Sequence, residues 1–339
     1  MFRNLKELMN LQNEKISKPL GLIRKLGGFS FQPLAILFFL TYRCNLKCFF
    51  CLQPRERKKL VERYRDMNRK ELRFFVENVK RSFIFKPRIH LFGGEPLLHP
   101  EFGWFIAYLK RQGFSSSVTT NGFELKKFAR DLVVNEVEHL NVSIDDIGER
   151  HDKARGVKGV FERALNGIEE VGRLREEMKK RYPRICINIT INDSNYYRLE
   201  EIVEALQGYA DSINLQHLIF YSSRDIRVDS EKLKRSIIEV KKRYRISMFP
   251  GIRLNDLRFY YSDRDIFADK CIRPWIILTV MPNGDVVTCP LNVRVGNVLE
   301  TPLRKIWNSK KFREFRNRIE RNGIKNYTVC RRCCHRQYY

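Results

Sequence analysis

The sequence predicts an α/β protein with a largely parallel sheet, and two observations support this fold class. First, short apolar runs of strand length alternate six times with longer amphipathic stretches of helical length between residues 35 and 225. Such alternation indicates βαβ units and therefore parallel strands, in either a closed or an open sheet. Second, 43% of the 339 residues are hydrophobic and 12% are aromatic, which is enough to build a large core.

Each expected strand is a short run of mainly apolar or β-branched residues, as buried parallel strands require. We predict six such strands, at residues 35–41, 88–92, 115–120, 139–145, 185–191 and 212–220. The stretches between them repeat their apolar residues at helical spacing. We predict helices there at residues 68–82, 101–112, 125–136, 157–181 and 195–207.

The pattern changes after residue 225, so we divide the chain into four parts. A helix is expected at 229–244, two strands at 276–281 and 285–289, and a basic helix at 302–321. The two strands flank Pro282-Asn283-Gly284-Asp285, which is typical of a hairpin turn. The four parts are a basic amphipathic segment (residues 1–34), an alternating core (35–225), a connecting helical segment (226–270) and a cysteine-rich end (271–339).

Charge and hydropathy restrict the kinds of partner and the cellular location that we expect for the protein. With 65 Lys and Arg against 39 Asp and Glu, the net charge is +26, which implies an acidic partner such as nucleic acid, a membrane surface or an anionic substrate. The longest apolar run, Pro33–Tyr42, is about half of the roughly 20 residues that a membrane span needs. We expect a cytoplasmic protein. The basic segment 1–34 either packs on the core or contacts a membrane surface peripherally.

Three cysteines follow the first expected strand directly. Cys44, Cys48 and Cys51 lie within eight residues, so that one loop can direct three thiols to one metal centre. Structural zinc sites use four ligands, and no nearby His or Cys supplies the fourth. A cubane iron–sulfur cluster held by three cysteines leaves one iron open, which fits this set better than zinc or a chance cluster of core cysteines.

At these residues the sequence resembles the radical S-adenosylmethionine (SAM) superfamily. The segment Thr41–Cys48 is similar to the cluster loop of that family, and Gly93-Gly94-Glu95-Pro96 is similar to its SAM-binding turn. The resemblance implies a partial (β/α)6 TIM-like barrel over residues 35–225. It also implies a 4Fe-4S cluster on Cys44, Cys48 and Cys51, with S-adenosyl-L-methionine bound to its open iron.

The same resemblance assigns further residues to the SAM site. Asn121 directly follows the third expected strand, and Ser143 and Asp145 belong to the end of the fourth, where these residues would line the cofactor. Asn121 is equally well explained as a turn residue before Gly122, and Asp146 competes with Asp145 for the inward position. A polar set alternates with isoleucines along the fifth strand, facing either the barrel mouth or a solvated edge: Asn188, Thr190 and Asn192.

A second group of cysteines lies toward the C-terminus. It consists of four residues whose spacing alone fits zinc or a 4Fe-4S cluster: Cys271, Cys289, Cys330 and Cys333. The CxxxxxxxxxxxxGxxxxC segment around Gly284 resembles the SPASM, or shorter twitch, extension of radical SAM proteins. The printed sequence ends six residues after Cys333, so we expect a single auxiliary 4Fe-4S cluster. Cys334 and His335 stay unassigned.

The resemblance implies a radical SAM oxidoreductase or maturase. A reduced cluster would cleave SAM to a 5′-deoxyadenosyl radical, which abstracts hydrogen from an unidentified substrate. The substrate is a ribosomal peptide, an anionic small molecule or a lipid, and the electron comes from a flavodoxin- or ferredoxin-type protein. Two alternatives stay open, an RNA-modifying radical SAM enzyme and a non-catalytic zinc protein that binds nucleic acid. Residues 304–336 carry twelve Lys and Arg against two Glu, which keeps nucleic acid open without favouring it.

Overall fold

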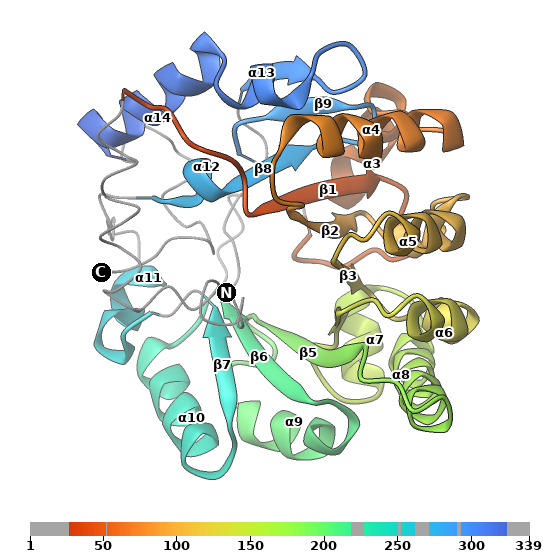
Figure 1. The fold of residues 1–339 in the computed structure, drawn as a ribbon. Coiled ribbons are helices and arrows are strands. Elements are labelled where there is room, and N and C mark those ends of the chain that lie inside the picture. Colours follow the sequence, from red (N-terminus) through yellow and green to blue (C-terminus); the bar gives the residue numbers. More distant parts are fainter. Residues whose placement is uncertain are drawn as a thin grey trace.

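A computed structural model describes residues 27–51, 53–217, 227–249, 252–261, 271–289 and 293–323. Within these residues one curved sheet is surrounded by helices (Figure 1). Its strands, in chain order, are β1 (Ala35–Thr41), β2 (Arg88–Gly93), β3 (Ser116–Thr120), β4 (His139–Ser143), β5 (Arg184–Ile191), β6 (Ser212–His217), β7 (Ile246–Phe249), β8 (Ile277–Val280), β9 (Asp285–Val287) and β10 (Arg294–Asn297).

The strand order is β10-β9-β8-β1-β2-β3-β4-β5-β6-β7. All neighbours from β8 to β7 in this order are parallel, whereas β8–β9 and β9–β10 are antiparallel. The two edge strands of the described sheet, β10 and β7, do not pair with each other. The predicted α/β class with a partial barrel is therefore confirmed.

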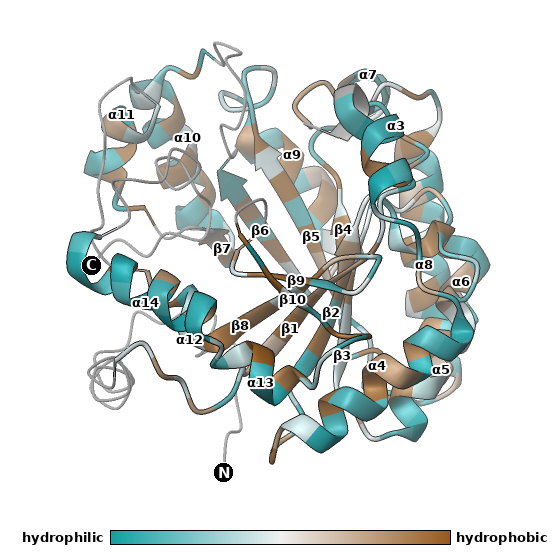
Figure 2. Ribbon diagram, turned by 90° about the horizontal axis from the view of Figure 1, so that it is seen from above, coloured by the Kyte–Doolittle hydropathy of each residue, from teal (hydrophilic) through white to brown (hydrophobic). Residues whose placement is uncertain are grey.

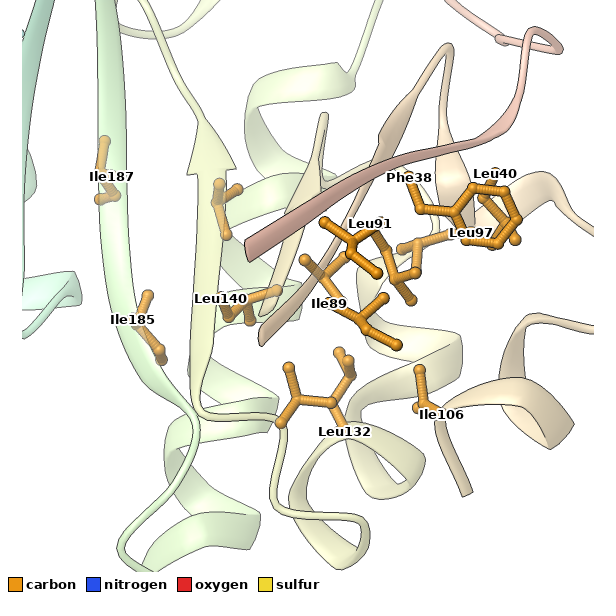
Figure 3. Packing of buried hydrophobic residues seen from close by; sticks show 14 of the residues in the cluster. Phe38, Leu40, Ile89, Leu91, Leu97, Ile106, Leu132, Leu140, Ile185 and Ile187 are labelled. Carbon is orange, nitrogen blue, oxygen red and sulfur yellow. The ribbon is translucent and has the colours of Figure 1, made fainter. Parts of the chain in front are cut away.

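Helices cover the outer face of the sheet and enclose the core between themselves and the strands (Figure 3). The longer ones are α3 (Gln53–Arg63), α4 (Arg69–Ser82), α5 (Phe102–Arg111), α6 (Leu125–Val134), α7 (Glu149–Arg155), α8 (Val160–Glu177), α9 (Leu199–Leu206), α10 (Ser230–Arg243) and α14 (Lys310–Asn322). The shorter ones are α11 (Leu257–Tyr260), α12 (Arg273–Ile276), α13 (Leu303–Trp307) and the 3-10 turns Pro96–Leu98, Gln207–Tyr209 and Leu254–Asp256.

Side-chain alternation divides the strands into an outer apolar face and an inner face. In β5, Ile185, Ile187 and Ile189 are buried in the helix-covered core, while Cys186 and Asn188 between them are only partly buried and face inward. The strands β1, β2 and β8 are largely hydrophobic, whereas α14 is mostly hydrophilic (Figure 2). The inner face of the strands therefore forms the lumen of the partial barrel.

Several elements differ from the sequence prediction. The single basic helix expected at 302–321 is two helices, α13 and α14, because Ser309 begins a new helix and its hydroxyl accepts a hydrogen bond from Phe312 N (3.3 Å). The helix expected at 157–181 begins only at Val160, after the separate α7. The strands β7 and β10 and the helix α3 were not predicted. β7 lies in the segment 226–270 and adds to the sheet beside β6.

Parts of some predictions lie outside the described residues. These parts are residues 1–26 of the basic segment, residues 218–220 of the sixth expected strand, and Cys330, Cys333, Cys334 and His335. Among the helices that the structure describes, none is long and apolar enough to cross a membrane.

Candidate active site

The three clustered cysteines lie on the loop that follows β1, at the carboxyl end of the parallel strands. Parallel α/β folds place ligands at this end of the sheet. Two backbone bonds tie the loop to the end of α7, from Lys47 N to Arg155 O (2.9 Å) and from Phe49 N to Ala154 O (3.2 Å). The Arg57 guanidinium of α3 donates to Cys44 O (3.0 Å) from the other side.

The loop holds its three thiols close together in a partly apolar setting. Cys48 is buried beside Leu46 and Val160, and Cys44 and Cys51 pack against the same cluster. Burial raises the pKa of Cys44, and it raises the pKa of Cys48 to about 11. The Arg155 guanidinium opposes this effect on the pKa of Cys48, because it favours the thiolate.

This donor set fits a cubane cluster better than a single ion. Within the described ranges, no three His, Cys, Asp or Glu side chains are arranged to hold one metal ion. In a cubane each thiolate binds a different iron, so the sulfurs stand farther apart than they do around one ion. Three thiols on one loop, with no fourth described ligand beside them, are the residues that a cluster with one open iron requires.

The Gly93-Gly94 turn packs directly against the backbone that leads into the cysteine loop. Gly94 N donates to Thr41 O (2.7 Å) and Glu95 N donates to Arg43 O (2.7 Å). A Cβ on Gly94 would lie 2.2 Å from Arg43 O, and Gly93 has φ +134°, which side chains rarely adopt. Only glycine allows this approach, so the turn fixes the position of the loop.

Glu95 is fully buried, and its carboxylate joins the ends of β2 and β3. It accepts hydrogen bonds from Thr120 Oγ1 (2.7 Å), Asn121 N (2.7 Å) and Leu97 N (3.1 Å). Burial raises the pKa of Glu95 to about 7, against the lowering effect of these bonds. In the described structure the carboxylate therefore organises the turn. Pro96 follows it as the first residue of a 3-10 turn.

Asn121 contacts the cysteine loop itself. Its amide donates to Asn45 Oδ1 (2.8 Å) and lies 3.9 Å from Cys44 Sγ. Its carbonyl accepts from Phe123 N (2.9 Å), so it also closes the turn after β3. The turn role that the sequence offered for Asn121 is therefore present in the structure, together with a direct contact to the cysteine loop.

Asp145 is fully buried and forms an ion pair with Arg155. Arg155 Nη2 lies 2.6 Å from Asp145 Oδ2, and Arg155 Nη1 lies 3.8 Å from Cys48 Sγ. The other carboxylate oxygen accepts from Thr190 N (2.9 Å). Burial alone would lower the pKa of Arg155, but Asp145 and Cys48 raise it above its ordinary value. The inward position belongs to Asp145, whereas Asp146 pairs with Arg198 (3.1 Å).

Two further residues complete this corner of the site. His151 is fully buried, and its Nδ1 accepts from Asp145 N (3.1 Å). Burial holds the pKa of His151 well below its ordinary value, so the imidazole is neutral. Ser143 ends β4 in register with Asn188 of β5 and is partly buried on the inner face.

Neutral hydrogen-bonding groups line part of the inner face of the strands. In one row, Asn214 Nδ2 donates to Asn188 Oδ1 (3.1 Å) and Ser247 Oγ donates to Asn214 Oδ1 (3.1 Å). Deeper in the lumen, His90 contacts Ser117 Oγ (2.7 Å) and Thr119 Oγ1 (3.1 Å) through its two ring nitrogens. Burial, with nearby Arg273 and Arg88, lowers the pKa of His90 to about 4, so this side chain is also neutral.

The described C-terminal cysteines lie toward the other end of the strands. Cys271 precedes α12, which leads into the start of β8, and β9 returns antiparallel so that Cys289 comes back toward that same end. β8 is parallel to β1, with Ala35 opposite Ile277. The inner face of the strands therefore extends from the cysteine loop toward Cys271 and Cys289, over roughly the 20 Å length of a seven-residue strand.

Sequence reasoning missed Arg57, His151 and Arg155. None belongs to a repeated or spaced pattern that indicates its role, and Arg155 reaches Cys48 across 107 residues of chain. The glycine after it carries a weak signal, because Gly156 has φ +71° and approaches Lys47 O closely.

Comparison with protein families finds two matches. Residues 38–176 match the radical SAM superfamily, and residues 271–334 match SPASM, an iron–sulfur cluster-binding domain. The protein is accordingly an enzyme that uses a 4Fe-4S cluster and SAM, with auxiliary iron–sulfur binding in its C-terminal domain.

Three curated relatives carry different names. A "GTP 3′,8-cyclase" of Campylobacter jejuni is 28% identical and covers 69% of this chain and 74% of its own. An "AdoMet-dependent heme synthase" of Methanosarcina barkeri is 28% identical, covering 90% of this chain and 92% of its own. A "PqqA peptide cyclase" of Streptomyces rochei is 27% identical, covering 84% and 78%.

Among solved structures, Streptococcus suis SuiB bound to S-adenosylmethionine superposes with a TM-score of 0.65. The alignment covers 88% of this chain and 69% of SuiB at 16% identity, a likeness of fold. SuiB has also been solved with its precursor peptide SuiA.

Proposed function

Because the chain belongs to the radical SAM superfamily and carries a SPASM domain, we propose that it is a maturase that oxidises a ribosomally made peptide. The single observation that carries the proposal is the row of neutral amide and hydroxyl groups on the inner face of β5, β6 and β7. The relative named for a peptide and the peptide-bound structural neighbour support the same substrate class.

The residues of this chain would have distinct roles in the reaction. When bound, the cluster and SAM supply one-electron cleavage to a radical that takes a hydrogen atom from the substrate. Cys44, Cys48 and Cys51 would hold the cluster, and the Gly93-Gly94 backbone fixes their loop. The apolar wall that contains Leu46 and Val160 would keep water from this end of the site.

The remaining SAM-site assignments stay proposals. Asn121 and Ser143 stand at the strand ends beside the loop, where a cofactor on the cluster would reach them. Glu95 and Asp145 are both engaged by protein donors, so we assign them to holding the site together. We assign Cys271 and Cys289 to the auxiliary 4Fe-4S cluster together with Cys330 and Cys333.

The side chains on the inner face of the strands favour a peptide substrate over the anionic alternatives. Amide and hydroxyl groups such as those of Asn188, Asn214 and Ser247 pair with neutral peptide groups. A triphosphate would need several cations. Of the charged side chains beside the cysteine loop, Arg155 is paired with Asp145, and the Arg57 guanidinium donates to Cys44 O.

The experiment compares substrates directly. The anaerobically reconstituted enzyme, with SAM and dithionite, is incubated separately with a pooled synthetic peptide library, GTP and an iron porphyrin, and 5′-deoxyadenosine is quantified. We expect the peptides alone to stimulate its formation and one peptide to lose the mass of two hydrogens. Stimulation by GTP or the porphyrin, without any peptide effect, would overturn the peptide assignment. We also propose a flavodoxin- or ferredoxin-type donor and a cytoplasmic setting.

A further inference from the structure

The strap of residues 27–34, which leads into β1, turns its aromatic side chains outward. Phe29 and Phe31 are 43% and 57% exposed, while Ser30 between them is 2% exposed. Ser30 is held inward because its hydroxyl donates to Trp275 O (2.8 Å) and its carbonyl accepts from Trp307 Nε1 (3.1 Å). Two phenylalanines thus face solvent where an extended segment normally places polar residues.

The strap has no freedom to rotate these rings into the protein. Arg316 Nη1 donates to Gly28 O (3.0 Å), and a Cβ on Gly28 would lie 2.4 Å from Arg313 O of α14. Asn308 Oδ1 accepts from Ser30 N (3.0 Å). Outward phenylalanines are therefore a fixed property of the folded chain.

A neighbouring loop extends the exposed apolar surface. The side-chain amide of Gln32 donates to Phe85 O (2.9 Å) through Nε2, and its Oε1 accepts from Phe85 N (3.2 Å) and Ile84 N (3.1 Å). Ile84 is 76% and Phe85 is 66% exposed. We call Phe29, Phe31, Leu34, Ile84 and Phe85 the aromatic patch. The bonds of Gln32 hold its two segments side by side, so these exposed apolar residues are grouped rather than scattered singly over the surface.

Exposed basic side chains lie on the helix beside the strap and at both ends of the neighbouring loop. α14 runs beside the strap (Figure 1). It exposes five basic residues against two acidic ones: Lys310, Lys311, Arg313, Arg318 and Arg321 against Glu314 and Glu320. Exposed Arg81 and Lys86 flank the loop of Ile84 and Phe85. The partner that this surface fits combines an apolar layer with negative charge.

We propose that the aromatic patch binds an anionic membrane surface, with its rings in the headgroup region and these basic residues against lipid phosphates. Aromatic side chains favour that depth, and Lys and Arg near an anionic leaflet add electrostatic attraction. The patch lies at the amino ends of β1 and β2, whereas the cysteine loop follows the carboxyl end of β1. Binding there leaves the loop of Cys44, Cys48 and Cys51 uncovered, and the inference does not depend on the proposed reaction.

The test is anaerobic co-sedimentation of the holoprotein with vesicles of phosphatidylcholine, with and without phosphatidylglycerol. We expect binding only to the anionic vesicles, and we expect Phe31→Ser/Phe85→Ser to weaken it at least about tenfold. The matched control is Tyr197→Ser, because Tyr197 is also 57% exposed but lies outside the patch. If the double variant loses iron, Ile84→Asp replaces it, since Ile84 is the most exposed residue of the patch.

Two charge-reversal double variants separate the electrostatic contribution to membrane binding. Arg81→Glu/Arg313→Glu should weaken binding by at least about tenfold, whereas Lys126→Glu/Lys127→Glu on α6, with the same change in net charge, should not. Three results would overturn the proposal. They are equal binding to neutral vesicles, no binding to anionic ones, and binding that survives the patch variants but disappears when residues 1–26 are removed.

Discussion

The buried pair of Arg155 and Asp145 makes a quantitative prediction about the cysteine site. Their side chains are 8% and 0% exposed, at a separation of 2.6 Å. Replacing Arg155 by Met keeps most of the side-chain volume but leaves Asp145 with only Thr190 N as a described donor. Removing one partner of a buried ion pair costs about 3–5 kcal/mol, because the other charge stays buried without compensation. We expect that loss for Arg155→Met, and a comparable one for Asp145→Asn.

The double variant is the decisive member of the series. With both charges removed, the penalty for an unpaired buried charge disappears, so the double variant should be no less stable than either single variant. The coupling energy should then be about 3 kcal/mol or more. Arg173→Met is the control, since Arg173 is 58% exposed in its pair with Glu170 and should cost less than about 1 kcal/mol.

The assay is anaerobic urea unfolding followed by far-ultraviolet circular dichroism, with all four variants prepared in parallel. Additive losses, or single losses no larger than that of Arg173→Met, would refute the idea that this pair organises the site. Arg155→Met also removes a donor from Cys48 Sγ, so iron retention after gel filtration should fall more than in the Arg173 control.

Three further predictions concern the same site. Gly94→Ala should lower the free energy of unfolding in urea by about 2–4 kcal/mol, because its Cβ would lie 2.2 Å from a carbonyl oxygen. Gly172→Ala is the control and should be neutral or stabilising, since nothing lies within 4 Å of its Cβ. Equal effects of the two substitutions would contradict the packing argument. Burial raises the pKa of Glu95 to about 7, so its protonated form stabilises the fold at low pH and that stability is lost as pH rises through 7. The wild type should therefore lose on the order of 1 kcal/mol between pH 6 and 8.5 relative to Glu95→Gln, and parallel pH profiles would disprove this. Asn121→Ala removes an amide that lies 3.9 Å from Cys44 Sγ. The reduction potential of the cluster on the loop after β1 should fall by up to roughly 40 mV in a redox titration monitored by electron paramagnetic resonance, while the iron content stays the same. An unchanged potential would count against this contact.

The sequence predicted those elements whose pattern is local and strong. The strand expected at 185–191 is β5, because isoleucines alternate with smaller or polar residues along it. The helix α3 was missed because residues 53–63 are mostly charged and lack an apolar stripe. The break in the helix expected at 302–321 was missed because a capping serine within a basic run is a weak signal beside continuous helical spacing.

The candidate site likewise contains residues that the sequence predicted and residues that it did not. The contiguous motifs around Cys44 and Gly94 were visible because their residues are neighbours in the chain as well as in space. Arg155 was not, because its role depends on α7 packing against a loop 107 residues earlier in the chain. The aromatic patch was equally hidden, since whether Phe31 faces inward or outward depends on the hydrogen bonds of Ser30.

The central claim is that two separate cysteine groups hold iron–sulfur clusters, one of them on the loop after β1. Iron, sulfide and zinc per chain after anaerobic reconstitution test it most directly, in the wild type and in a variant with Cys44, Cys48 and Cys51 all replaced by Ala. We predict about eight irons with matching sulfide in the wild type and about four in the variant. Zinc without iron in the wild type, or an iron content that the three substitutions leave unchanged, would contradict the account.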